Sequence, residues 1–299
     1  MKRFVFFALI VIAIIVATIL YDRTAQMEPG TQATVATTIY PLYDITRNIA
    51  GDALNVAYIL PPGASPHTFE PTPSFIRQLE NVDVVYAIGF GIDDWSQTIT
   101  QSVGAEQVNV SQNIHLLPHA TLLETEDDED VNNIDPHYWL SVPNAITIAQ
   151  TVTTDLATRY PEHQVAFKAN LASYTEQLTA LNNEIIDTLA DISNTNIVTI
   201  HDGWYYFADA YGLHVSASFE PTAGREPTPQ YLVELTQVVQ ASGTSTIYAE
   251  PQLSTAGLEA FAKDNNMTVQ EVDPIGGTQG RETYIQLMRF NANQISHNR

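Results

Sequence analysis

Short apolar runs alternate with amphipathic segments along most of this 299-residue chain. Six runs have the length and the β-branched content of buried strands: 35–40, 55–60, 84–89, 196–200, 245–249 and 267–272. Helical segments separate the runs, which is typical of parallel sheets whose strands are connected by helices. Because three runs fall in each half of the chain, the pattern predicts an α/β fold with two similar lobes.

The most regular apolar stripe lies between the two halves. Apolar residues recur there at gaps of three or four: Phe167, Leu171, Tyr174, Leu178, Leu181, Ile185, Leu189 and Ile192. This spacing predicts one amphipathic helix over residues 161–193. At 1.5 Å per residue the helix would be roughly 45 Å long, enough to run along both lobes. We interpret it as a rigid connection between them.

A short sequence repeats in the two halves. Glu-Pro-Thr-Pro occurs at 70–73 and again at 226–229, each time before an amphipathic segment that leads to a predicted strand. Thr suits the N-cap of a helix and Pro suits its first position. The repeat therefore indicates two copies of one α/β unit.

The N-terminus has the composition of an export signal. Lys2 and Arg3 precede a segment, 4–20, that is apolar at 16 of its 17 positions. Bulky and charged residues follow it, so we favour an uncleaved membrane anchor with the rest of the chain outside the cytoplasm. The expected organisation is a signal or anchor at 1–22, a tether at 23–33, lobes at 34–160 and 194–299, and a linking helix at 161–193.

Charge and cysteine content exclude several classes of function. The formal net charge is −22, from 34 acidic and 12 basic residues, which argues against a nucleic-acid partner and is compatible with binding cations. The chain contains no cysteine, so it has neither disulfides nor thiolate ligands. Nitrogen and oxygen atoms would therefore have to hold any metal ion.

Four polar residues are candidate metal ligands: His67, His137, His201 and Asp273. They lie 70, 64 and 72 residues apart, and each is next to an apolar run. Three imidazoles and one carboxylate are a sufficient ligand set for a divalent transition metal, above all zinc. His67, His201 and Asp273 follow predicted strands, where open α/β sheets bind ligands. We expect a metal site between the lobes, with Glu250 as the alternative carboxylate.

The segments around these residues resemble a known family in order along the chain. They are 61–95 (PPGASPHTFEPTPSFIRQLENVDVVYAIGFGIDDW), 135–145 (DPHYWLSVPNA), 200–215 (IHDGWYYFADAYGLHV), 218–235, 248–254 (YAEPQLS), 272–277 (VDPIGG) and 284–291. They are similar to the metal-binding proteins of ABC importers for zinc and manganese, and the resemblance covers roughly residues 35–294. It implies two α/β lobes joined by one long helix, with the metal buried between them.

The resemblance also implies the metal ligands. The positions that bind metal in the family correspond to His67, His137, His201 and Asp273. In manganese and iron members the third position is usually a glutamate, so His201 points to zinc, with manganese as the alternative. The expected protein is a monomeric extracytoplasmic zinc-binding protein that delivers the ion to an ABC permease and is not an enzyme.

Two further interpretations accompany this expectation. A secreted zinc hydrolase would need a general base near the metal, for which Glu250 or Asp202 are candidates. The segment 124–135 contains seven acidic residues before His137, with only His115 and His119 nearby. We interpret it as a solvated loop rather than as a segment that collects metal.

Overall fold

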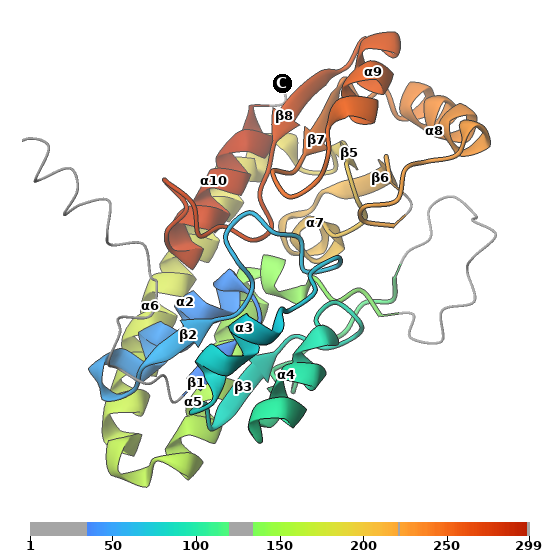
Figure 1. The fold of residues 1–299 in the computed structure, drawn as a ribbon. Helices are drawn as coiled ribbons and strands as arrows, with labels where there is room; N and C mark the ends of the chain where they lie inside the picture. Colours follow the sequence, from blue (N-terminus) through green and yellow to red (C-terminus); the bar gives the residue numbers. More distant parts are fainter. Residues whose placement is uncertain (1–34, 120–133, 221, 298–299) are drawn as a thin grey trace, which may run out of the picture.

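The computed structural model describes residues 35–119, 134–220 and 222–297. The predicted anchor, the tether and most of the acidic segment 124–135 lie outside these ranges. The described chain forms two α/β lobes connected by the long helix α6 (Gln164–Leu189), as Figure 1 shows. None of the helices in these ranges combines the length and the apolarity needed to cross a bilayer.

The N-terminal lobe is built on a parallel sheet with strand order β2-β1-β3-β4. Its strands are β1 (Val35–Thr37), β2 (Val56–Tyr58), β3 (Val84–Ala87) and β4 (Glu106–Asn109), and its helices are α2 (Tyr40–Ala50), α3 (Pro73–Ile76), α4 (Trp95–Val103) and α5 (Val142–Arg159). The first three strands confirm predicted runs. The sequence pattern missed β4, because an edge strand with a largely exposed Glu-Gln-Val-Asn sequence has no apolar run.

The C-terminal lobe repeats this arrangement with strand order β6-β5-β7-β8, all parallel. Its strands are β5 (Asn196–Thr199), β6 (His214–Ser218), β7 (Thr246–Ala249) and β8 (Thr268–Glu271), and its helices are α7 (Tyr205–Tyr211), α8 (Pro229–Ser242), α9 (Ala256–Asp264) and α10 (Tyr284–Ser296). The edge strand β6 was also absent from the predicted set. Both lobes therefore place their first strand between the second and the third, as expected for two copies of one unit.

The repeated Glu-Pro-Thr-Pro sequences have the predicted capping role. The side chain of Thr72 accepts a hydrogen bond from the Phe75 amide at the start of α3. Thr228 accepts one from the Tyr231 amide at the start of α8. In both helices proline occupies the first turn, where a missing N–H costs nothing.

The predicted linking helix is confirmed. Together with the 3₁₀ turns Pro161–His163 and Ala190–Ile192, α6 covers the expected segment. The apolar stripe is buried against α2, α5 and α10, apart from Leu171, which is half-buried. Polar contacts also fix the helix to both lobes. In the first lobe, the side-chain amide of Asn170 on α6 donates a hydrogen bond to the carbonyl of Ile49 at 2.9 Å. In the second lobe, Arg289 on α10 donates two hydrogen bonds to Glu184 on α6, at 2.6 and 2.7 Å.

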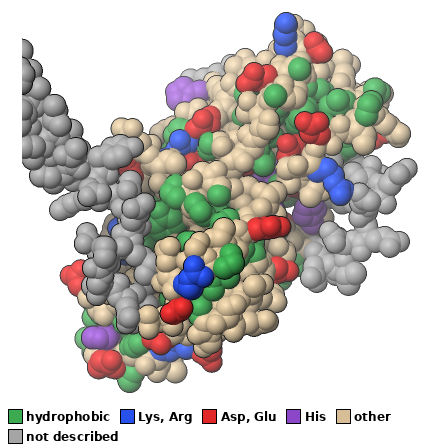
Figure 2. Space-filling model, in the orientation of Figure 1, with side chains coloured by type: hydrophobic (Ala, Val, Ile, Leu, Met, Phe, Trp, Pro, Cys, Tyr) green, Lys and Arg blue, Asp and Glu red, His purple; other side chains and the backbone are tan. Residues whose placement is uncertain are grey.

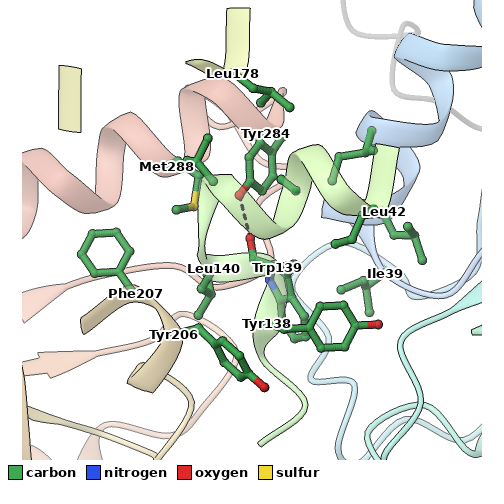
Figure 3. Close-up of a cluster of buried hydrophobic side chains, with 14 of the residues drawn as sticks. Ile39, Leu42, Tyr138, Trp139, Leu140, Leu178, Tyr206, Phe207, Tyr284 and Met288 are labelled. Atoms are coloured by element: carbon green, nitrogen blue, oxygen red, sulfur yellow. Dashed lines mark hydrogen bonds between the residues drawn. The ribbon is translucent and has the colours of Figure 1, made fainter. Parts of the chain in front are cut away.

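A single hydrophobic core joins the two lobes. Figure 3 shows its centre, where the 3₁₀ helix η3 (Tyr138–Leu140) of the first lobe packs between α7 and α10 of the second. The hydroxyl of Tyr284 donates to the carbonyl of Trp139 at 2.7 Å, and the indole N–H of Trp139 donates to the carbonyl of Pro274 at 2.8 Å. Because close-packed interiors resist deformation, this shared core restricts large movements of one lobe against the other.

The surface agrees with the composition. Figure 2 shows acidic side chains distributed over both lobes on this face, as the net charge of −22 leads one to expect. Such a surface attracts cations over a range set by the ionic strength.

Candidate metal centre

Three histidines from distant parts of the chain meet between the lobes. The Nε2 atom of His137 lies 3.1 Å from Nε2 of His67 and 3.2 Å from Nε2 of His201. One ligand nitrogen from each ring lies within 4.8 Å of the other two. Nitrogens bound to zinc at 2.0–2.1 Å with tetrahedral angles are separated by about 3.3 Å. The spacing of the imidazoles therefore fits one ion held by all three.

Rigid elements position each ring. His67 lies within the loop that connects β2 to α3, and the indole N–H of Trp95 donates to the Pro66 carbonyl at 3.0 Å to hold that loop. His137 is the N-cap residue of η3 and is almost completely buried. His201 directly follows β5, at the carboxyl end of the sheet, and is also buried.

Two buried carboxylates orient two of the rings. Asp135 Oδ1 lies 2.7 Å from Nδ1 of His137 and accepts that residue's backbone amide at 2.9 Å. Glu250 Oε1 lies 2.8 Å from Nδ1 of His201 and accepts the Trp204 indole N–H at 2.8 Å. Carboxylates that contact Nδ1 leave Nε2 free to bind a metal and make it more basic.

The sequence interpretation missed these orienting roles. In the sequence Asp135 is only one residue of a motif, and Glu250 is a candidate only for an alternative ligand or a base. An acidic residue two positions before a candidate histidine is the signal that could have identified Asp135. No comparable local signal exists for Glu250, because it reaches His201 from the neighbouring strand β7.

The protein environment separates the proton affinities of two of the rings. Desolvation, followed by the proximity of His137 and His201, holds the pKa of His67 well below its usual value. Burial also lowers the pKa of His201, but the charge and the hydrogen bonding of Glu250 outweigh burial and raise it to about 9. At neutral pH an incoming metal therefore meets a neutral His67 and has to displace a proton from His201.

Asp273 does not belong to the group of three histidines. It is completely buried, and its Oδ1 atom accepts hydrogen bonds from the amides of Ile275 and Gly276 and from Gln252 Nε2, at 2.8–2.9 Å. Its Oδ2 atom accepts no hydrogen bond from the described residues and lies 3.2 Å from Arg281 Nη1. The structure thus brings together three of the four predicted ligands, and a ligand role for Asp273 stays a prediction.

The space beside the histidines is small. A cavity of about 10 Å³ adjoins them, lined by Ser65, Pro66, His67, His137, Trp139, His201, Glu250, Gln252, Leu253, Pro274 and Ile275. Gly203 also lies against two of the rings. A Cβ atom built on Gly203 would lie 2.6 Å from His201 Nε2 and 3.0 Å from His137 Cδ2. The centre has room for an ion but not for an organic substrate.

The carboxylates considered as hydrolytic bases are already engaged. Glu250 contacts His201 and Trp204, as described above. Asp202 forms an ion pair with His119 at 2.6 Å, which joins the two lobes next to the histidines. His119, which precedes the acidic segment 124–135 in the sequence, is therefore placed close to the centre.

Comparisons with known proteins show which proteins this chain resembles. A family model described as zinc-uptake complex component A, periplasmic, matches residues 35–298. The chain is 30% identical to the manganese-binding lipoprotein MntA of Halalkalibacterium halodurans, over 97% of each protein. It is 27% identical to the zinc-binding lipoprotein AdcA of Streptococcus pneumoniae, over 94% of this chain but only 59% of that protein. A crystal structure of ZnuA matches with a TM-score of 0.79 at 26% identity, covering 88% of this chain and 98% of the other.

Proposed function

The chain belongs to the family of the zinc-uptake complex component A, and we propose that it binds one zinc ion and delivers it to an ABC permease. The members of this family are extracytoplasmic metal-binding components of ABC importers and are not enzymes. Relatives named for zinc and for manganese are both similar to this chain, so the choice of zinc is the proposal.

The convergence of three Nε2 atoms is the observation that supports zinc. His67, His137 and His201 offer an all-nitrogen set at separations close to those of tetrahedral zinc. Oxygen-rich sites suit manganese better, whereas imidazole suits zinc. Asp273 is the proposed fourth ligand, because its Oδ2 atom is buried and accepts no hydrogen bond from the described residues.

Charge balance supports a buried divalent ion at this centre. Two orienting carboxylates, Asp135 and Glu250, contribute two negative charges directly behind the imidazoles. They offset the charge of a divalent ion without binding it, so the ion can be held in a buried position. Binding displaces the proton that Glu250 favours on His201, which couples zinc capture to proton release.

Release of the ion follows from the distribution of ligands over the two lobes. His67 and His137 belong to the first lobe and His201 to the second, so a relative shift of the lobes pulls the ligands apart. Because the lobes share one core, we propose a small displacement on the permease rather than a wide hinge opening. A shift of a few tenths of an ångström already exceeds what a zinc–nitrogen bond tolerates.

Attachment to the membrane is also part of the proposal. MntA and AdcA are named lipoproteins, whereas this chain has no cysteine that could carry a lipid. We propose that the apolar segment 4–20 replaces the lipid as the anchor.

Calorimetry on chelator-treated protein tests the metal assignment. We expect one equivalent of zinc to bind, zinc to displace manganese, and His201→Ala to abolish tight binding. His214→Ala is the matched control, because His214 is exposed on the edge strand β6. Tighter binding of manganese than of zinc would support a manganese-binding protein instead. Zinc binding by His201→Ala with the affinity of the wild type would show that the three histidines do not form the metal site.

A further inference from the structure

One arginine lies between an exposed carboxylate and a buried one. Arg281 Nη1 donates to Glu271 Oε1 at 2.6 Å and lies 3.2 Å from Asp273 Oδ2. The side chain of Glu271 is 50% exposed, that of Arg281 16% and that of Asp273 0%. The guanidinium also lies over the Phe290 ring, 4.4 Å from its centroid. Packing and charge together hold Arg281 at the buried carboxylate.

The two oxygens of Asp273 differ in what surrounds them. Oδ1 accepts from the amides of Ile275 and Gly276 and from Gln252, which fixes the orientation of the carboxylate. Oδ2 is buried and accepts no hydrogen bond from the described residues, although Arg281 is within 3.2 Å. The arginine thus balances the charge of this oxygen while its N–H groups leave the lone pairs of Oδ2 unused. The proposed role of Asp273 as the fourth ligand would use these lone pairs.

We propose that Arg281 weakens the affinity of the centre for zinc, because its positive charge already balances the charge of Asp273 Oδ2 and repels an ion that approaches this oxygen. This inference rests on the proposed function, in which Asp273 is the fourth ligand. A guanidinium at this distance stabilises the carboxylate before the ion binds, and it repels a divalent ion that approaches the same oxygen. Both effects reduce the free energy gained on binding. A protein that must hand its ion to a permease needs such a limit on affinity.

Glu271 reduces the effect of Arg281 on Asp273. Its carboxylate attracts the same Nη1 atom and so draws the guanidinium away from Asp273. Removal of the negative charge on Glu271 should strengthen the hold of Arg281 on Oδ2. Substitutions at these two positions are therefore expected to change zinc affinity in opposite directions, which a general loss of structure would not do.

The test measures zinc affinity by competition with a chromophoric chelator, and zinc release by stopped flow. Arg281→Met should bind zinc at least tenfold more tightly and release it correspondingly more slowly. Glu271→Gln should bind zinc several-fold more weakly. In an Asp273→Asn background the effect of Arg281→Met should vanish. Arg289→Met is the matched control, because Arg289 pairs with Glu184 on the exposed surface and should leave affinity unchanged.

Several outcomes would overturn the inference. Unchanged or weaker binding by Arg281→Met would mean that Arg281 does not weaken the affinity for zinc. If Arg281→Met does not fold, Arg281→Lys can be measured in its place. Because lysine keeps the positive charge, a zinc affinity several-fold or more above wild type in Arg281→Lys would also contradict the proposal. The visible spectrum of the Co²⁺ form should change in Asp273→Asn, and an unchanged spectrum would remove Asp273 as a ligand. If the wild-type protein binds no zinc stoichiometrically, the proposed function itself fails.

Discussion

The substitution Gly203→Ala is the most direct test of the geometry of the centre. The residue has no left-handed backbone conformation, so alanine fits its backbone, but the added Cβ would lie 2.6 Å from His201 Nε2 and 2.9 Å from His201 Cε1. Non-bonded heavy atoms prefer separations of about 3.5–4.0 Å. The imidazole of His201 would therefore have to move by roughly 0.9 Å or more. Metal–ligand distances tolerate only about 0.2 Å, so we expect Gly203→Ala to remove His201 from the centre.

The expected loss of zinc affinity is large. Substitution of a residue that only orients a ligand costs about 10–100-fold in affinity, so displacement of a ligand should cost at least about 100-fold. A chelator competition titration measures this loss, and thermal unfolding of the metal-free variant shows whether the fold is retained. Gly257→Ala is the matched control, because Gly257 lies in α9 and its new Cβ would meet Phe219 rather than a histidine.

The reasoning would be refuted by wild-type zinc affinity in Gly203→Ala. It would equally be refuted if Gly203→Ala and Gly257→Ala lost affinity to the same extent, since only one of them contacts the centre. A drop in unfolding temperature that accounts for the whole loss would show that alanine disturbs the fold instead of the ring.

Three further predictions concern the surroundings of the centre. Glu250→Gln should weaken zinc binding by about 10–100-fold in the same titration at pH 9, where little proton competition remains at His201, because His201 loses the carboxylate that orients it. Zinc affinity should rise by about tenfold per pH unit from pH 7 towards 9, because binding displaces a proton from His201, whose pKa is raised to about 9. Calorimetry across this range checks the slope; a pH-independent affinity would contradict it, and Glu250→Gln should flatten it. Trp139→Phe should lower the free energy of unfolding by about 1–3 kcal/mol in denaturant titrations, because the buried carbonyl of Pro274 loses its donor. An unchanged unfolding midpoint would mean that this bond between the lobes contributes nothing.

The sequence predicted the buried strands and the linking helix well, because their patterns are local and strong. The stripe from Phe167 to Ile192 is long enough to identify a helix without other information, and six apolar runs matched six strands. Both missed strands, β4 and β6, lie at the edges of their sheets and are largely polar or partly exposed. An edge strand buries little, so its residues do not have to show an apolar run.

The centre was predicted in part. Residue chemistry and position relative to the strands selected His67, His137 and His201, and the structure brings their Nε2 atoms together. The same reasoning selected Asp273, which follows β8 but lies outside the group. The direction of a short side chain depends on its hydrogen bonds, here those from Ile275, Gly276 and Gln252, and no sequence pattern shows them.

The sequence by itself therefore determined the α/β class, the two similar units, the long helix and the residue types available to a metal. These properties follow from local periodicity and from side-chain chemistry. Only the tertiary structure decided which ligands converge, that Asp135 and Glu250 orient them, that Gly203 must lack a side chain, and that Arg281 lies at Asp273. These contacts join residues far apart in the chain, and their distances depend on how two lobes pack over one shared core.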